Sequence, residues 1–208
     1  MITLFHFPRS SASYRVRIAL NLKGVTYQCK LIDFRKNEQR SDEFLARNPQ
    51  GLVPALEIDG RTISQSLAII DYLEITRPLP ALLPEDPWTR SRVLSMAMVI
   101  ACDIHPLNNL RVLEYLRTTH GAEDAVVTDW YAHWIRTGLA ALERLAADFA
   151  ESPFLTGTSP GLFEVCLVPQ LSNARRYAVN LSPYPRLLEI DARANALESF
   201  ARAAPNPG

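Results

Sequence analysis

Hydrophobic positions in the first 76 residues follow two alternating patterns. Short apolar or alternating runs predict strands, and apolar residues spaced three or four apart predict helices. The order of these patterns is β-α-β-α-β-β-α, which suffices for a small α/β domain. The predicted strands cover residues 1–7, 25–34, 53–59 and 60–64, and the predicted helices cover residues 11–24, 41–51 and 64–76.

Cap and turn residues support three of these elements. Gly24 suits the C-terminal end of the first helix, and Ser41 suits the N-cap of the second. Asp59-Gly60 lies between two strand patterns and is a strong hairpin signal. The boundaries of the first domain are therefore marked by turn chemistry as well as by periodicity.

A proline-rich segment separates this region from an all-helical remainder. Prolines at 78, 80, 84 and 87 cannot continue a helix and predict a linker. Beyond it the helical pattern covers residues 88–121, with a kink expected near Pro106, then 123–150, 162–179 and 185–204. We expect a first domain at residues 1–79, a linker at 80–87 and an all-α domain at 88–208.

Composition and charge exclude several classes of protein. Lys plus Arg (22) equals Asp plus Glu (22), so the charge favours neither nucleic acid nor an anionic membrane. No uninterrupted apolar run reaches the 18 or so residues of a membrane span, and the N-terminus lacks a signal-peptide pattern. Three cysteines far apart predict reduced core thiols, with no disulfide framework and no metal site. We expect a cytoplasmic protein.

Serines crowd the start of the first helix, in "RSSASYRVRIAL". Capping alone explains hydroxyls at such a position. The segment also lies between a strand and a helix, where the helix dipole attracts anions, and Arg9 adds a full positive charge. Ser10, Ser11 and Ser13 are therefore candidates both for capping and for holding an anion.

Two more segments have a structural and a functional interpretation. Val53-Pro54 enters a strand, where proline indicates either an edge strand or a cis bond that leaves the Val53 backbone free to pair with an extended peptide. Gln65 and Ser66 begin a helix, and they either cap it or bind a carboxylate.

The three segments together resemble the glutathione-binding site of the cytosolic glutathione transferases. The likeness is most specific to the zeta class, the maleylacetoacetate and maleylpyruvate isomerases, and extends from residue 3 to about residue 187. The matching motifs are "SSASYRVRIALNLKG", "NPQGLVPAL", "SQSLAIIDYLE", "DIHPLNNLRVLEYL", "CLVPQ", "NARRY" and "VNLSPYP".

This resemblance implies a fold and a cofactor site. The expected fold is a thioredoxin-like α/β N-terminal domain followed by an all-α C-terminal domain, the glutathione transferase architecture. Ser10 is implied to hydrogen-bond the glutathione thiolate, with Ser11 as second candidate and Ser13 as a cap residue only. A hydroxyl and a helix N-terminus would lower the thiol pKa from about 8.5 by roughly one to two units. The other implied glutathione-binding residues are Gln50, Val53, Pro54, Gln65, Ser66, His105 and Asn109.

The resemblance also implies a reaction and a substrate class. Zeta-class isomerases add the glutathione thiolate reversibly to a cis double bond of maleylpyruvate or maleylacetoacetate, intermediates of aromatic degradation, and release the fumaryl product. The substrate is a small dicarboxylate, which planar arginines bind well. Arg9, Arg111 and Arg176 are implied for this role, and Arg9 and Arg176 join the serines as the catalytic set. Arg175 points about 100° away around the same helix.

Alternatives remain for these residues and for the function. His105 is otherwise a core histidine bound to a carbonyl, and each arginine is otherwise part of a surface ion pair. The second functional interpretation is a glutathione transferase or dehalogenase of small α-halo acids, and a third is a non-catalytic scaffold. Family members are typically homodimers, so we expect a homodimer.

Two positions depart from the family pattern. Ala12 replaces the usual cysteine, so the reactive sulfur must come from glutathione. Gly161 and Glu164 replace a Ser or Thr followed three residues later by Asp, which predicts a helix cap weaker by a few tenths to about 1 kcal/mol.

Overall fold

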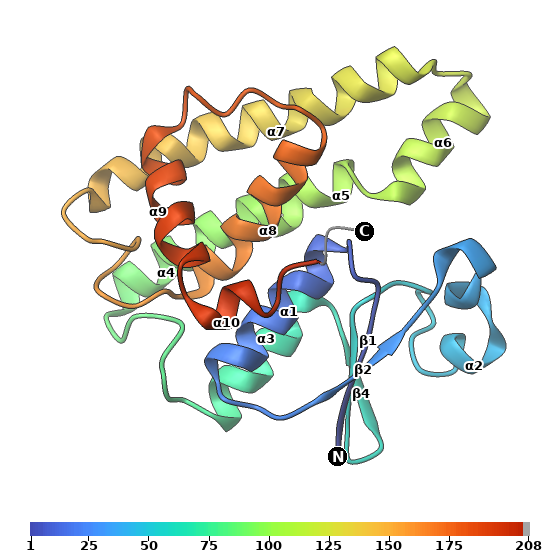
Figure 1. The fold of residues 1–208 in the computed structure, drawn as a ribbon, viewed down its shortest axis with the longest axis horizontal. Coiled ribbons are helices and arrows are strands. Elements are labelled where there is room, and N and C mark those ends of the chain that lie inside the picture. Colours follow the sequence, from blue (N-terminus) through green and yellow to red (C-terminus); the bar gives the residue numbers. More distant parts are fainter. Residues whose placement is uncertain (206–208) are drawn as a thin grey trace. The chain divides into compact units, whose positions relative to one another are not determined.

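The computed structural model describes residues 1–205, which form two compact units. The first unit comprises Met1–Leu82 and the segment from Leu197 onward, and the second comprises Leu83–Ala196. Figure 1 shows the chain coloured along its sequence, with the sheet and its helices in blue and blue-green. Each unit is described by itself.

A four-stranded sheet forms the centre of the first unit, in the order β2-β1-β3-β4. β1 pairs parallel with β2 and antiparallel with β3, and β3 pairs antiparallel with β4. The strands are β1 (Ile2–His6), β2 (Gln28–Leu31), β3 (Ala55–Ile58) and β4 (Arg61–Ser64), and the helices are α1 (Ser11–Leu22), α2 (Asp42–Leu45) and α3 (Ser66–Thr76), with 3₁₀ turns at Phe34–Lys36 and Glu38–Arg40.

Both faces of this sheet are covered. Successive strand residues face opposite sides, and Phe5 and Ala55 belong to a small cluster with Phe44 of α2. Leu4 and Leu56, fully buried on the other face, lie toward α1 and α3, which flank the sheet on the side away from α2 (Figure 1). The predicted α/β order of elements is confirmed, including the hairpin at Asp59-Gly60.

The end of the chain belongs to the first unit, which differs from the expected domain limits. We expected residues 88–208 to form one helical domain and residues 185–204 to form one helix. The helix instead ends at Asn195, and a short α10 (Glu198–Ala201) follows. Arg17 Nε donates to the Ala203 carbonyl at 2.7 Å, and Asn21 Nδ2 donates to the Ser199 carbonyl at 2.8 Å. These bonds to α1 and the burial of Phe200 hold the segment in the first unit.

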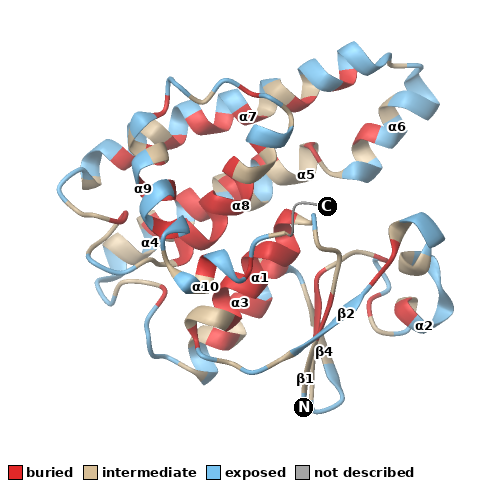
Figure 2. Cartoon of the chain, in the orientation of Figure 1, coloured by how far each residue is buried: buried red, intermediate tan, exposed pale blue. Residues whose placement is uncertain are grey.

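The second unit is helical throughout its described length. Its buried residues follow the inner faces of α7 and almost all of α8, which Figure 2 shows in red. The elements are α4 (Pro87–Met98), a π-helical turn η3 (Val99–Ile104), α5 (His105–Leu107), α6 (Leu110–His120), α7 (Asp124–Ala146), a 3₁₀ turn at Ala147–Phe149, α8 (Leu162–Arg176) and α9 (Pro185–Asn195).

The predicted kink near Pro106 proves to be a break two residues later. α5 ends at Leu107, and Asn109 then takes an extended conformation and caps α6, with its side-chain oxygen accepting from the Arg111 N–H at 3.1 Å. A proline cannot donate the helical hydrogen bond, and an asparagine is among the best caps for a new helix. The break therefore lies where the next cap is available.

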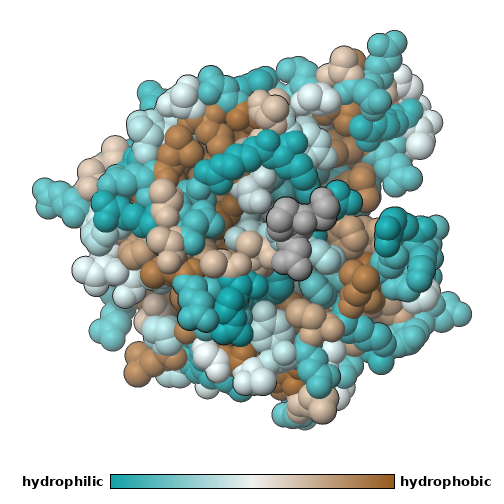
Figure 3. Space-filling model, in the orientation of Figure 1, coloured by the Kyte–Doolittle hydropathy of each residue, from teal (hydrophilic) through white to brown (hydrophobic). Residues whose placement is uncertain are grey.

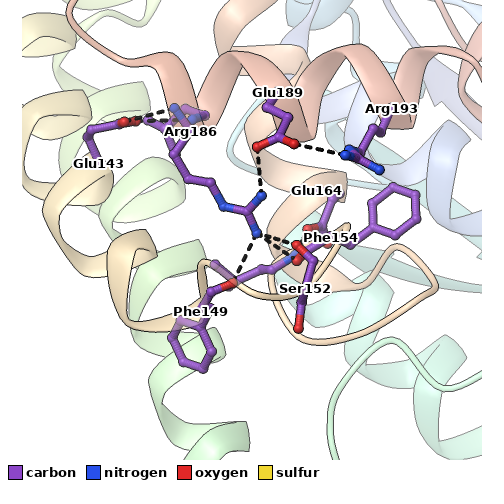
Figure 4. A network of polar contacts seen from close by, with 10 residues as sticks. Glu143, Phe149, Ser152, Phe154, Glu164, Arg186, Glu189 and Arg193 are labelled. Carbon is purple, nitrogen blue, oxygen red and sulfur yellow. Dashed lines mark hydrogen bonds and ion pairs between the residues drawn. The ribbon is translucent and has the colours of Figure 1, made fainter.

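Arg186 joins several loops of the second unit to α9. Its guanidinium donates to the carbonyls of Phe149, Ser152 and Phe154 and pairs with Glu189, while Glu143 accepts from its backbone N–H at 2.8 Å (Figure 4). One arginine thus supplies hydrogen bonds to three loop carbonyls, because buried backbone groups need hydrogen-bond partners.

Two expectations from composition need correction. Cys29 and Cys102 are exposed and only Cys166 is buried, because Cys29 lies on the exposed edge strand β2 and Cys102 on the outer side of η3. One helical stretch, Pro87–His120, is long and apolar enough to cross a membrane by length and composition, although the sequence has no uninterrupted apolar run of that length. Such a stretch is weak evidence for a span, because core helices of soluble proteins meet the same criteria.

Figure 3 shows apolar residues as separate patches among hydrophilic ones on the face viewed.

Candidate functional site

The pairing of the strands brings three predicted segments of the first unit to one end of the sheet. Phe5 pairs with Ala55, and Ala55 pairs with Ser64. At this end of the sheet, β1 ends and the chain continues to Ser10. Val53 precedes the start of β3 at the same end. β4 also ends there and leads into Gln65 and Ser66. The three segments therefore lie at the same end of the sheet.

Ser10 is the N-cap of α1. Its Oγ accepts from the Ser13 N–H at 3.2 Å, and its φ of −71° and ψ of 118° are extended. A hydroxyl that accepts one hydrogen bond keeps its proton for donation to another group. Ser10 is half-buried, so capping the helix and donating to an anion are compatible at this residue.

The neighbouring hydroxyls are less accessible. Ser11 is 4% exposed and Ser13 is fully buried. Arg9 is exposed, its guanidinium lies 5.9 Å from the centre of the Phe7 ring, and no carboxylate of the described residues pairs with it. Ser10 is therefore the more accessible of the first two serine hydroxyls.

Val53-Pro54 is a cis peptide bond, and the backbone around it is partly held by its neighbours. Asn48 Nδ2 donates to the Leu52 carbonyl at 2.7 Å, while Asn48 Oδ1 accepts from the Gln50 N–H at 3.2 Å. Within residues 1–205, the Val53 N–H and C=O have no hydrogen-bond partner. Val53 is half-buried and thus offers both backbone groups to an extended ligand.

α3 begins with an unusual backbone conformation. Gln65 has a φ of 70°, which residues other than glycine rarely adopt. Its Nε2 donates to Gln50 Oε1 at 2.9 Å, so the structure joins these two predicted residues directly. Such local strain is often found where backbone groups are aimed at a ligand.

Ser66 has a partner that the sequence analysis missed. Arg15 Nη1 donates to Ser66 Oγ at 3.3 Å, and Arg15 is 1% exposed. A guanidinium is permanently charged, so the α3 N-terminus carries a buried cation beneath it. The signal in the sequence is weak, because Arg15 lies in a helix that also buries Arg17 and two serines.

The electrostatics of these two helix starts favour an anion. Neither α1 nor α3 has an acidic residue in its first turn. The first N–H groups of a helix lack helical partners and carry the positive end of the helix dipole. This end of the sheet therefore combines the first N–H groups of two helices, the hydroxyls of Ser10 and Ser66, and the cations Arg9 and Arg15.

Predicted residues of the second unit lie in two segments. His105 begins α5 and is half-buried, whereas Asn109 caps α6. The helical pattern over residues 88–121 predicts His105 and Asn109 on one helix face at i, i+4, which is wrong because the chain leaves the helix after Leu107. Arg111 follows at the start of α6, exposed and with no carboxylate partner among the described residues.

The adjacent arginines at the end of α8 have different environments. Arg175 pairs with the buried carboxylate of Asp191. Arg176 pairs with no carboxylate of the described residues, but its side chain hydrogen-bonds the Tyr131 side chain. Its guanidinium donates to Asn173 Oδ1 at 3.0 Å and lies 5.3 Å from the centre of the Tyr177 ring. Arg176 is exposed and keeps donors for an added carboxylate, while Arg175 is engaged.

The exclusion of a metal site remains an expectation from the sequence. Among residues 1–205 there is no group of three or more His, Cys, Asp or Glu side chains placed to hold a metal ion.

Known proteins resemble this chain over nearly its whole length. Residues 1–74 match the family model "Glutathione S-transferase, N-terminal domain". A maleylpyruvate isomerase from a Ralstonia species is 47% identical over 203 residues, covering 97% of this chain and 96% of the relative.

Solved structures agree with this result. One described as the holo structure of a maleylpyruvate isomerase, a bacterial zeta-class glutathione S-transferase, has a TM-score of 0.96 at 46% identity and covers 99% of this chain and 98% of its own. A maleylacetoacetate isomerase from Anaeromyxobacter dehalogenans with bound glutathione has a TM-score of 0.89 at 40% identity, covering 100% of this chain and 96% of its own. The predicted architecture of a thioredoxin-like domain and a helical domain is confirmed, and the chain belongs to the zeta class of the glutathione S-transferases, the family of the maleylpyruvate and maleylacetoacetate isomerases.

Proposed function

We propose that this protein is a glutathione-dependent cis–trans isomerase of maleylpyruvate or maleylacetoacetate in aromatic compound degradation. The observation that carries the proposal is the Ser10 hydroxyl, which caps α1 and keeps its proton for a thiolate at the edge of the sheet. Relatives with this activity at 47% identity over nearly the full chain support it.

Residues of the first unit fit glutathione. The unpaired Val53 N–H and C=O suit the backbone of an extended peptide. Gln65 and Ser66 suit the γ-glutamyl carboxylate, because the α3 N-terminus has no acid in its first turn and Arg15 lies behind Ser66. Gln50 orients Gln65 through their hydrogen bond, and Pro54 shapes the turn.

Glutathione, when bound, supplies a thiolate that adds reversibly to the double bond and leaves after the bond rotates. Ser10 stabilises that thiolate by donating a hydrogen bond to it, with Ser11 as second candidate. Arg9, Arg111 and Arg176 bind the substrate carboxylates and stabilise the negative charge that the substrate gains when the thiolate adds. Their lack of carboxylate partners in the described chain supports this role. His105 and Asn109 contribute polar groups to glutathione binding.

Family membership supports a proposal for the assembly and location of the protein. We propose a homodimer in the cytoplasm whose partners are glutathione and a small dicarboxylate, without nucleic acid or membrane.

The decisive experiment follows loss of the cis substrate with glutathione well below the substrate concentration. An isomerase completes many turnovers per glutathione, whereas a transferase or dehalogenase consumes one glutathione for each product. Maleylpyruvate and maleylacetoacetate are assayed side by side to identify the substrate. Stoichiometric consumption of glutathione sinks the isomerase proposal.

Ser10→Ala tests the role of the hydroxyl. Loss of its hydrogen bond is expected to raise the pKa of bound glutathione by roughly one unit, which lowers the thiolate fraction at pH 7, and turnover with it, roughly three- to eightfold. Ultraviolet absorbance of the bound thiolate against pH gives the pKa directly. Ser13→Ala is the matched control, because its buried Oγ makes no hydrogen bond within the described residues. An unshifted thiol pKa in Ser10→Ala, with a shift in Ser11→Ala, would transfer the role to Ser11.

A further inference from the structure

Two neighbouring residues of α7 contact both of the second unit's candidate segments. Trp130 Nε1 donates to the Leu107 carbonyl at 2.9 Å, and the Tyr131 carbonyl accepts from Asn108 Nδ2 at 3.0 Å. Leu107 and Asn108 form the break between α5 and α6, so both bonds hold the turn whose ends are His105 and Asn109.

The same turn is also fixed from its N-terminal side. Ile104, the last residue of η3, is 1% exposed and precedes His105. It packs so closely on Gly138 of α7 that a Cβ at this glycine would overlap Ile104 Cγ1 and Cδ1. α7 therefore contacts the chain directly before His105 and directly before Asn109, which leaves the turn little freedom.

Tyr131 reaches the second segment with its ring. The rings of Tyr131 and Tyr177 are stacked, with centres 3.6 Å apart and planes 16° apart. The Arg176 guanidinium lies over the Tyr177 ring. Tyr131, which is 2% exposed, therefore supports Arg176 in two ways, through the Tyr177 ring and through a hydrogen bond between the Tyr131 and Arg176 side chains.

We propose that Trp130 and Tyr131 are positioning residues, Trp130 for the turn of His105 and Asn109 and Tyr131, through Tyr177, for Arg176. The proposal rests on the proposed function for the roles of these three residues. Two adjacent residues of α7 thus position different parts of the site, one the glutathione-binding residues and the other the dicarboxylate-binding arginine. Neither Trp130 nor Tyr131 touches a reacting group.

The competing explanation is that a neighbour on its own helix places the Arg176 side chain. Asn173 accepts from Arg176 and could hold it without the stack. That hydrogen bond is exposed, and such a bond exchanges readily with water, whereas the tyrosine stack is anchored in the core. The cation over an aromatic face also adds attraction of its own. The stack is thus the more rigid support.

Trp130→Phe tests the first half of the proposal. An aromatic side chain is kept, although a phenyl ring is smaller than indole, and the hydrogen bond to Leu107 is lost, so we expect glutathione affinity by calorimetry to fall roughly three- to tenfold. The His105 ring signals in a ¹H–¹³C NMR spectrum should shift. Trp88→Phe is the matched control, since Trp88 is 75% exposed. In a His105→Ala background, Trp130→Phe should have a clearly smaller effect.

Tyr177→Leu tests the second half, with maleate as the binding probe. We expect maleate affinity to fall roughly two- to fivefold with glutathione affinity unchanged. Tyr177→Phe should restore it, and the effect should vanish in an Arg176→Gln background. Tyr131→Leu should reproduce the loss, and Tyr131→Phe, which keeps the stacked ring but lacks the hydroxyl that bonds Arg176, should show a smaller loss. Tyr115→Leu, at a residue 57% exposed, is the control.

The readouts separate this proposal from the proposed function. Absence of wild-type isomerase activity contradicts the function, while the NMR shifts and both affinities still measure positioning. Unmoved His105 signals with unchanged glutathione affinity in Trp130→Phe overturn the first half. Additive effects with Arg176→Gln, or equal loss of both affinities in Tyr177→Leu, overturn the second half.

Discussion

Arg17 joins three separate parts of the first unit through one guanidinium. Besides its bond to Ala203, it donates to the Pro8 carbonyl at 3.0 Å and contacts His6 Nδ1 at 3.2 Å. An arginine has only donors, so Nδ1 must accept and the His6 proton must lie on Nε2. Burial, and then the charge of Arg17, lowers the pKa of His6 to about 4.

His6 therefore makes stability depend on pH. The unfolded chain binds a proton at His6 near pH 6.5, whereas the folded chain does so only near pH 4. Because the unfolded state binds more protons in this window, the free energy of unfolding falls as pH decreases from about 6.5 to 4.

Urea unfolding of the wild type and His6→Asn at several pH values checks this expectation. The variant has no titrating group at this position, so its free energy of unfolding should fall less across the window. His120→Asn, at an exposed histidine, is the control. Parallel pH curves for the wild type and His6→Asn would contradict the prediction.

Site residues were predictable where local pattern and chemistry coincide. Ser10 was identified from its position between strand and helix, and the structure gives it the expected cap. Arg15 was not identified, because its bond to Ser66 joins residues 51 positions apart. Periodicity contains no information about such a tertiary partner.

The start of α8 shows how one element replaces a missing cap. Gly161 has no side chain to cap the helix, as expected, but Glu164 accepts from the Gly161 N–H at 2.8 Å and from the Leu155 N–H at 2.7 Å. Half of a capping box therefore remains, and the same carboxylate ties the preceding loop. Burial raises the pKa of Glu164.

Glu164→Ala should destabilise the protein by about 2–4 kcal/mol, because it leaves two N–H groups without their acceptor. Glu164→Gln keeps an acceptor oxygen and should cost less. Urea or thermal unfolding measures both, and Glu198→Ala at an exposed site is the control. A loss below 1 kcal/mol in Glu164→Ala would show that water replaces the carboxylate at both bonds.

Elements were predictable where their signals are local. The Asp59-Gly60 hairpin agrees with the structure because both residues have positive φ, 49° and 78°, as a two-residue turn of this kind requires. The π-helical turn at Val99–Ile104 was not predicted, since an i→i+5 turn has no distinct hydrophobic period over so few residues. Its conformation depends on packing against Gly138.

At the scale of the whole molecule, sequence order and compact units differ. The first unit takes its last segment from the far end of the chain. The helical pattern of residues 185–204 did not reveal this division, because the same periodicity suits either unit. Only the hydrogen bonds of Arg17 and Asn21 to that segment, and the burial of Phe200, decide it.

Phe200→Ala should therefore destabilise the first unit. Phe200 is fully buried, and a buried Phe→Ala substitution costs about 3–5 kcal/mol. Hydrogen exchange should increase in α1, which contacts α10, and less in α7 and α8. Ile75→Ala, at a residue 73% exposed, is the control. Increased exchange confined to α8 and α9 would contradict the assignment of this segment.

The return of the chain to its first unit has a consequence for biosynthesis. The second unit is one continuous segment, Leu83–Ala196, and its full sequence leaves the ribosome before Phe200 does. Domains ordinarily complete folding in the order of synthesis. Here the nascent first unit still lacks the carbonyls of Ser199 and Ala203 when the second is complete. The domain made first is thus the domain finished last, and a stalled or truncated translation product would keep α1 without its final partners.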